Sequence, residues 1–307
     1  MDFHDHILST LGHAPDHIEP GVLHRFSTNG KRSDTSGWCK LFEDGKGGVF
    51  GDFRAGISSS WSSVDRRLMT PAERAAFARQ VAQAAHEREV QRNERHKANA
   101  HFISGLLAAT VEVTAGDPVA RYFANRGLAG VWNFAPCIRL HPGLSYSHEG
   151  ERLGVFPTMV APLQAPDGKT VALHRTYLTP TGRKADVPTV KKLPPAAGTL
   201  KGAAIRLQPP RDGVLGVAEG IETALAASMV SALPVWSTYC ANGIETFNWP
   251  PFIRRLVIFS DADDAGRSAA ESLRQRAVKA RLSVSVMTPR TEGLDWLDVY
   301  ASEEVVQ

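Results

Sequence analysis

Two short apolar runs in the C-terminal part of the chain each end in acidic side chains, and this pattern constrains the fold more than any other. Residues 214–218 are apolar and precede Glu219, and residues 256–259 are closely followed by Asp261 and Asp263. Short apolar runs of this kind are typical of buried strands. In an open parallel sheet, the carboxyl ends of both strands lie at one edge, where ligands bind. The pattern therefore predicts a parallel sheet with three carboxylates gathered at that edge.

Three carboxylates at one edge would repel one another, by about 4 kcal/mol per pair at ~4 Å and an effective dielectric constant of ~20. A bound divalent cation removes that cost, and oxygen ligands favour Mg²⁺ or Mn²⁺ over zinc. Asp261 and Asp263 would point to the same side of an extended backbone. Such a set fits two-metal phosphoryl or nucleotidyl transfer. The alternative, that Asp264 and its neighbours only cap a helix, explains one acid but not the strand-end Glu219 as well.

The chain is predicted to be a mixed α/β protein. From residue 212 onward, strand and helix patterns alternate, which favours a parallel sheet flanked by helices. Gly-rich turns between short runs indicate a small β-rich module at the N-terminus, and Thr70-Pro71 opens an Ala- and charge-rich helical stretch. The predicted segments are a β-rich module (1–66), a helical connector (67–111), a basic α/β subdomain (112–211) and the parallel-sheet domain (212–307).

Individual elements follow from the same patterns. The connector is expected to form one or two helices, at 74–98 and 101–109. The predicted strands downstream are 155–162, 171–178, 203–207, 214–218, 235–239, 256–260 and 282–287, and the predicted helices are 118–126, 222–231 and 265–280. Trp38, Phe50, Phe53 and Trp61 are interpreted as core residues of the β-rich module, with stacking on single-stranded bases as the alternative.

Positive charge is concentrated just before the acidic strand ends. Residues 169–211 contain nine Lys or Arg side chains and a single acid, Asp186. This arrangement suits a polyanion on one surface and metal ions on the adjoining one, although a solvated charged surface is the simpler alternative. Lys191 and Lys192 lie between Pro188 and Pro194, which limits their local conformations.

Composition excludes several classes of protein. The hydrophobic fraction of 43% is typical of a folded domain. No apolar run approaches the ~20 residues needed to cross a bilayer, and the N-terminus lacks the pattern of a signal peptide, so a cytoplasmic protein is expected. Cys39, Cys137 and Cys240 are far apart, so free thiols are expected and a four-ligand zinc site is not, although eleven histidines leave a mixed site formally open.

The residues around these acids resemble a known family. VAEGIETAL at 217–225 and FSDADDAG at 259–266 resemble the Toprim domain of bacterial-type primases, topoisomerases and some nucleases, whose motif is a strand-end Glu and a DxD that bind Mg²⁺. PVARYFANRGL at 118–128 is similar to the helix that opens the bacterial primase core. The resemblance covers roughly residues 112–301. The sequences of its motifs are most similar to those of primases of phages, conjugative plasmids and integrated elements.

Three departures from that family are visible. Residues 37–56 resemble the position of the primase zinc ribbon but lack its cysteines and histidine. Thr223 stands where many primases carry another acid, and Asp-Trp-Leu-Asp at 295–298 replaces Asp-Pro-Asp. The first departure makes zinc unexpected in the N-terminal module, and the other two affect accessory ligands only.

The resemblance implies roles for individual residues. Glu219, Asp261 and Asp263 would be catalytic and would hold Mg²⁺ or Mn²⁺, with Asp295 as an auxiliary acid. The residues expected to bind nucleic acid or nucleotide are Arg175, Lys184, Lys191, Lys192 and Lys201.

The expected function is that of a DNA primase, which synthesises short RNA primers on a single-stranded DNA template from ribonucleoside triphosphates. The context would be replication of a mobile element or phage. The absence of the GxxxxGK[ST] motif predicts no fused helicase motor, so any replicative helicase would be a separate partner. The alternatives are a metal-dependent Toprim nuclease, with water as nucleophile, and a non-catalytic DNA-binding replication accessory. A topoisomerase is least expected, because the chain has no room for a domain with the catalytic tyrosine.

Overall fold

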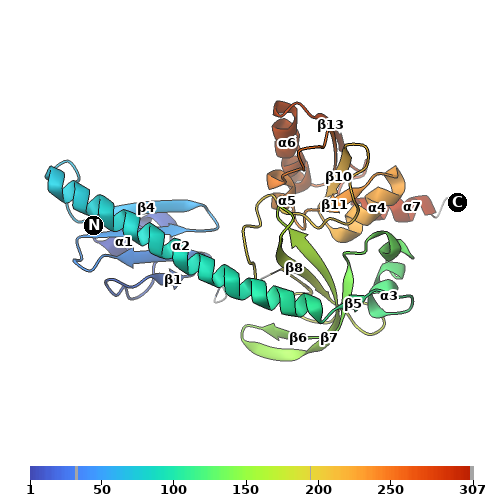
Figure 1. Cartoon of the computed structure of the whole chain (residues 1–307), viewed down its shortest axis with the longest axis horizontal. Coiled ribbons are helices and arrows are strands. Elements are labelled where there is room, and N and C mark those ends of the chain that lie inside the picture. The colour runs from blue at the N-terminus through green and yellow to red at the C-terminus, as the bar shows by residue number, and fades with distance from the viewer. Residues whose placement is uncertain (32–33, 194, 305–307) are drawn as a thin grey trace. The chain divides into compact units, whose positions relative to one another are not determined.

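The computed structural model describes residues 1–31, 34–193 and 195–304 (Figure 1). The chain divides into two compact units, residues 1–94 and 95–307. The long helix α2 (Pro71–Ala108) begins in the first unit and ends in the second. Of the one or two helices expected at 74–98 and 101–109, the structure forms one continuous helix. No helix in the described part of the chain is long and apolar enough to cross a membrane.

The first unit is an antiparallel sheet with strand order β1-β2-β3-β4, and one helix packs on each of its faces. Its elements are α1 (Phe3–Leu11), β1 (His24–Phe26), β2 (Gly37–Leu41), β3 (Gly47–Asp52), β4 (Ile57–Ser62) and the first part of α2. All six residues of β3 are buried. A Cβ at Gly48 would lie 2.7 Å from the Phe3 ring, so glycine permits the close approach of α1 to the sheet.

The interpretation of the four aromatic residues as core residues holds for three of them. Trp38 and Phe50 are buried, and Trp61 packs against the cluster formed with α1. Phe53 is 48% exposed, and the Arg25 guanidinium lies 4.4 Å from the centre of its ring. Phe53 is therefore the aromatic side chain of this set that remains accessible to a ligand.

The second unit contains two sheets. The antiparallel sheet has the order β5-β6-β7-β8-β9, and the parallel sheet has the order β11-β10-β12-β13. The antiparallel part comprises β5 (Val111–Glu112), α3 (Pro118–Ala124), the 3-10 helix η1 (Val131–Phe134), β6 (Arg139–His148), β7 (Glu151–Gln164), β8 (Thr170–Tyr177) and β9 (Lys191–Lys192). The parallel part comprises β10 (Val214–Ala218), α4 (Ile221–Ser231), β11 (Val235–Ser237), α5 (Ala241–Thr246), β12 (Arg255–Phe259), α6 (Asp264–Lys279), β13 (Ser283–Met287) and α7 (Trp296–Glu304).

Both faces of the central strands β10 and β12 are buried, which explains why these two strands are apolar runs. Leu215, Val217, Leu256 and Ile258 face one cluster, which includes residues of α5 and α6. Ala218, Val257 and Phe259 face a second cluster, which includes residues of α4 and α7. The second cluster continues into α3 and the antiparallel sheet, so the two sheets of this unit share one core. The predicted mixed α/β class, with a C-terminal parallel sheet flanked by helices, is confirmed.

The strand predicted at 203–207 is not formed as such. Ala204 makes an isolated antiparallel bridge to Gln164, and Ile205 makes another to Ser237. Because these two bridges reach different sheets, the segment joins them instead of extending either one. Strand β6 was not predicted, and the three cysteines are unpaired, as expected.

Candidate metal and nucleotide site

The acids that end the two apolar runs lie at the same edge of the parallel sheet. Strands β10 and β12 are hydrogen-bonded neighbours, and Ala218 pairs with Phe259. Glu219 directly follows β10, whereas Asp261 and Asp263 follow β12. The chain leaves β10 for β11 on one side and returns to β12 on the other. The acids therefore lie at the point where the strand order reverses, which is the usual ligand position in an open α/β sheet.

The electrostatics of this edge disfavour ionised carboxylates. Burial raises the pKa of Asp261 to about 7, and Glu219, Asp295, Asp263 and Asp298 add to the effect in that order. Burial also raises the pKa of Glu219, with a further contribution from Asp263 that Lys191 partly offsets. The Oδ1 atom of Asp261 is buried and has no hydrogen-bond partner. A buried carboxylate oxygen without a donor is costly, and a cation would satisfy it.

Two of the predicted acids also have structural roles. Asp263 is the N-cap of α6, and its Oδ1 accepts a hydrogen bond from the Gly266 amide at 2.6 Å. The capping alternative thus describes one oxygen of Asp263. Asp295 accepts hydrogen bonds from the amides of Leu297 (2.7 Å) and Asp298 (3.0 Å), and so caps the start of α7.

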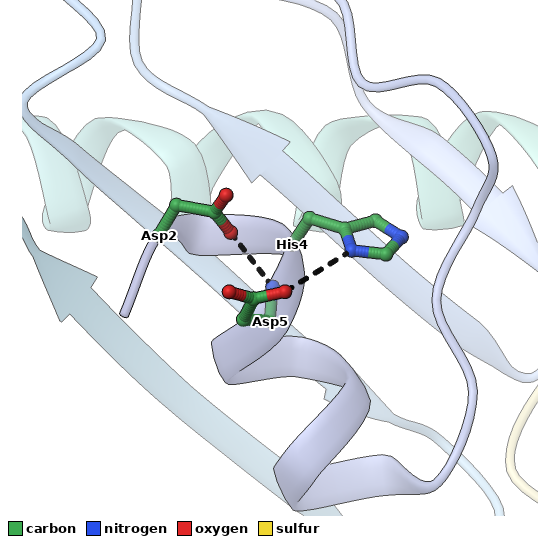
Figure 2. A group of neighbouring side chains, drawn as sticks. All are labelled: Asp2, His4 and Asp5. Atoms are coloured by element: carbon green, nitrogen blue, oxygen red, sulfur yellow. Dashed lines mark hydrogen bonds and ion pairs between the residues drawn. The ribbon is translucent and has the colours of Figure 1, made fainter.

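The side chains of Glu219, Asp261 and Asp263 do not converge tightly. Among the described residues, the one group of three or more potential ligands with ligand atoms all within 4.8 Å of one another is Asp2, His4 and Asp5 (Figure 2). All three are exposed, and Asp2 is the N-cap of α1, where it accepts a hydrogen bond from the Asp5 amide. Helix capping thus accounts for Asp2, and His4 Nδ1 lies 3.9 Å from Oδ1 of Asp5.

The two adjacent lysines of β9 point to different surroundings. The Lys191 ammonium lies 3.0 Å from Oε2 of Glu222, a side chain that is only 5% exposed. The Tyr122 hydroxyl donates to the other carboxylate oxygen of Glu222. Lys192 instead lies 3.8 Å from the centre of the Tyr146 ring and donates to a backbone carbonyl of β6. Of the two, Lys191 is therefore the one directed to the parallel-sheet domain.

The remaining predicted basic residues are dispersed. Arg175 is buried, and burial lowers its pKa while Tyr177 opposes the shift. Lys184 is exposed and lines a cavity of about 410 Å³ together with Tyr122, Asn125, Arg126, Gly182 and Arg183. Lys201 is exposed, and no described side-chain contact joins it to the other basic residues. The lining of the cavity contains three cationic residues and no acid, so it suits an anion.

Sequence reasoning missed Glu222 and Tyr122. Glu222 lies in the first turn of α4, in a run from Ile221 to Ala227 that is buried throughout. An acid within an otherwise apolar buried helix was the available signal. Its partners were not foreseeable, because Tyr122 lies on α3 and Lys191 on β9.

Comparison with known proteins agrees with this architecture. Residues 214–304 match the family model of the Toprim domain. The parallel-sheet part of the second unit is therefore a Toprim domain, which confirms the resemblance read from the sequence. Residues 94–207 match a second model, described as a domain of unknown function, DUF7146. No curated protein sequence matches the chain.

Solved structures of primase domains are similar to the chain at low sequence identity. The zinc-binding and RNA polymerase domains of the Aquifex aeolicus primase are 15% identical, with a TM-score of 0.44, over 100% of this chain and 82% of that chain. The primase fragment of the bacteriophage T7 primase-helicase is 16% identical, with a TM-score of 0.36, over 60% of this chain and 69% of that chain.

A DNA primase domain from Pseudomonas aeruginosa is 16% identical, with a TM-score of 0.37. The match covers 53% of this chain, and the chain spans about half the length of that domain, 52%. These likenesses are too distant to indicate an activity, whereas the Toprim match and the geometry of the sheet edge together define a candidate metal site.

Proposed function

We propose that this chain is a DNA primase, which joins ribonucleoside triphosphates into a short RNA primer on single-stranded DNA. The observation that carries the proposal is the set of acids at the switch point of a Toprim domain, with a buried, unpartnered oxygen on Asp261. Most buried polar atoms in folded proteins have a partner. The missing partner supports a cation site at the place where the Toprim motif expects one.

The residues that would hold Mg²⁺ or Mn²⁺ are Glu219, Asp261 and Asp263, with Asp295 as an auxiliary acid. The fit rests on oxygen donors alone and on the raised pKa values of Asp261 and Glu219, which a cation would lower. Bound divalent cations supply activation of the attacking hydroxyl and stabilisation of the leaving pyrophosphate. Zinc is not expected, because the set contains neither sulfur nor nitrogen ligands.

Basic side chains of the chain would bind the phosphates of the template and the nucleotides. Lys191 is held near the acid edge, and its charge offsets part of the repulsion on Glu219. The cavity lined by Arg126, Arg183 and Lys184 offers a second basic surface, on which the template backbone would lie. We propose smaller contributions to phosphate binding from Lys192, Lys201 and Arg175. Lys192 is engaged with the Tyr146 ring, and Arg175 is buried.

The proposed biological context is replication of a phage or mobile element, with a separate helicase as partner. It is supported by the EGIETAL sequence of the strand-end motif at 219–225, which resembles the motif of primases from such elements. Co-purification with a helicase encoded by the same element would test the partner.

The function is tested by incubating the full chain with single-stranded DNA and ribonucleoside triphosphates, with and without Mg²⁺. Primers that appear only with Mg²⁺ are the expected result. Shortened DNA would instead establish a Toprim nuclease. DNA binding without either product would establish a non-catalytic accessory.

A further inference from the structure

The ion pair between Glu222 and Lys191 is unusual because one partner is almost completely buried. Glu222 is 4% exposed, and its two oxygens accept from Lys191 and from Tyr122. Burial alone would raise the pKa of Glu222, but the Lys191 ammonium and the Tyr122 hydroxyl outweigh it and lower the pKa to about 2. Glu222 is therefore a fixed negative charge whose two oxygens are both satisfied.

Three separate segments converge on this carboxylate. Tyr122 lies on α3, Lys191 on β9 and Glu222 in the first turn of α4, only three residues after Glu219. The Oε2 atom of Glu222, which binds Lys191, lies 3.5 Å from the position that a Cβ on Gly220 would take. The ammonium is thereby held towards the carboxyl end of β10, where its charge partly offsets the rise in the pKa of the strand-end acid Glu219 that burial causes.

Neighbouring polar groups on β8 do not hydrogen-bond the Lys191 ammonium. Thr176 pairs with Lys191 in the antiparallel register, and His174 lies two residues away on the same face. Both His174 Nδ1 and Thr176 Oγ1 are buried without a hydrogen-bond partner. Among the described residues, Glu222 supplies the one hydrogen bond that fixes the Lys191 ammonium.

We propose that Glu222 and Tyr122 are positioning residues, which hold the Lys191 ammonium beside Glu219 so that it binds the triphosphate of an incoming nucleotide. This inference rests on the proposed function. A lysine is a point charge on a flexible stem, and fixing it in place before the ligand arrives reduces the entropy lost on binding. The Lys191 side chain remains 41% exposed, so a phosphate can reach it.

The test is binding of inorganic tripolyphosphate, in the presence of Mg²⁺, to the full chain by calorimetry. Lys191→Met should weaken binding by about tenfold, the effect expected for one lost charge contact. Glu222→Gln should weaken it by about fivefold. This direction is diagnostic, because removing a negative charge without moving Lys191 would tighten anion binding. Tyr122→Phe, which keeps the ring, should give a smaller weakening.

A double-mutant cycle separates positioning from a structural role. If Glu222 acts through Lys191, Glu222→Gln should have little further effect in the Lys191→Met background. The matched control is Asp167→Asn, which breaks the exposed pair with Lys169 at 3.1 Å and should leave binding unchanged. Unfolding temperatures should establish that each variant is folded.

Several results would overturn the inference. These are tighter or unchanged binding in Glu222→Gln, fully additive effects in the cycle, or no binding of tripolyphosphate by the unmodified chain. Failure of the unmodified chain to make primers would refute the proposed function instead, and would leave this binding test intact.

Discussion

Two aspartates of the N-terminal unit, Asp34 and Asp52, and Asp261 at the Toprim edge have opposite surroundings. Asp34 accepts hydrogen bonds from the amides of Thr28 (2.9 Å) and Ser36 (3.1 Å), and it also pairs with Arg54. Asp52 accepts from the amides of Arg54 (2.6 Å) and Ala55 (3.1 Å), and from the Thr28 hydroxyl. Asp261 has a buried oxygen with no donor at all.

The pKa values follow from this difference. Burial alone would raise the pKa of Asp34, but hydrogen bonds from Ser36 and Thr28 and the charge of Arg54 lower it to about 2. At the Toprim edge, burial and neighbouring acids raise the pKa of Asp261 to about 7. Asp34 and Asp52, which are saturated with donors, thus hold the fold together, whereas the buried oxygen of Asp261 has no donor and is available to a ligand.

The largest expected effect is loss of primer synthesis in Asp261→Asn. The substitution keeps the shape but removes the charge that would hold a cation, so we expect at least a roughly 100-fold decrease in rate. Primer yield on single-stranded template measures it. Asp264→Asn is the matched control, because Asp264 is exposed and lies at the same turn. Equal activity of both variants would contradict the metal assignment.

A smaller effect is expected from Asp34→Asn, which leaves a donor network without its acceptor charge. We expect the free energy of unfolding of the N-terminal unit to fall by about 1–3 kcal/mol. Denaturant unfolding of the full chain, followed by tryptophan fluorescence, should show it.

Because the folded-state pKa of Asp34 is lowered to about 2, its contribution to stability should be present above about pH 4 and lost as the pH falls towards 2. Asp44→Asn would weaken only exposed hydrogen bonds, from the Lys46 amide (2.9 Å) and the Gln80 side chain (3.1 Å), and should change stability less.

The opposite pH dependence is expected from Asp261. Its folded-state pKa of about 7 lies above the unfolded value, so the native state binds the proton more tightly and loses stability as the pH rises from about 4 to 7. In metal-free buffer at pH 8, Asp261→Asn should therefore be more stable than the unmodified chain, by on the order of 1 kcal/mol after solvent screening. Thermal unfolding tests this.

Addition of Mg²⁺ should reverse that order, because binding to the folded state stabilises only the chain that retains the site. An Asp261→Asn variant that gains as much stability from Mg²⁺ as the unmodified chain would place the cation elsewhere.

The smallest effect concerns the salt dependence of DNA binding. Lys191→Ala with Lys192→Ala should flatten the slope of log K against log salt by about 0.7 per lost phosphate contact on single-stranded DNA. The structure sharpens this expectation, since Lys192 is engaged with Tyr146 whereas Lys191 faces the Toprim domain. Single substitutions should show most of the change in Lys191→Ala. An unchanged slope would place both lysines away from the DNA.

The central strands β10 and β12 of the parallel sheet were predictable because burial on both faces makes them apolar runs. The bounds predicted for β10 agree with the structure, and those for β12 differ by one residue at each end. Strand β6 was missed because it is partly exposed and carries an irregularity between His141 and Leu144. Strand predictions from sequence therefore succeed where a local pattern of apolar residues determines whether the strand is buried.

The candidate site was predictable only in part. The strand-end acids follow from local sequence, and their common edge follows from parallel topology. The partners of Glu222 lie far away in sequence, so no local pattern could reveal that it holds Lys191. The same limit applies to Arg175, whose basic character suggested a surface role although the strand buries it.

The bridge between Ile205 and Ser237 has a practical consequence for dissecting the protein. It covers the outer edge of β11, which is otherwise the terminal strand of the parallel sheet. A fragment that starts at residue 212 would leave that edge bare, and unprotected strand edges promote aggregation. A fragment that starts near residue 95 would retain the cover, and is the better choice for expressing the Toprim domain in isolation from the N-terminal unit.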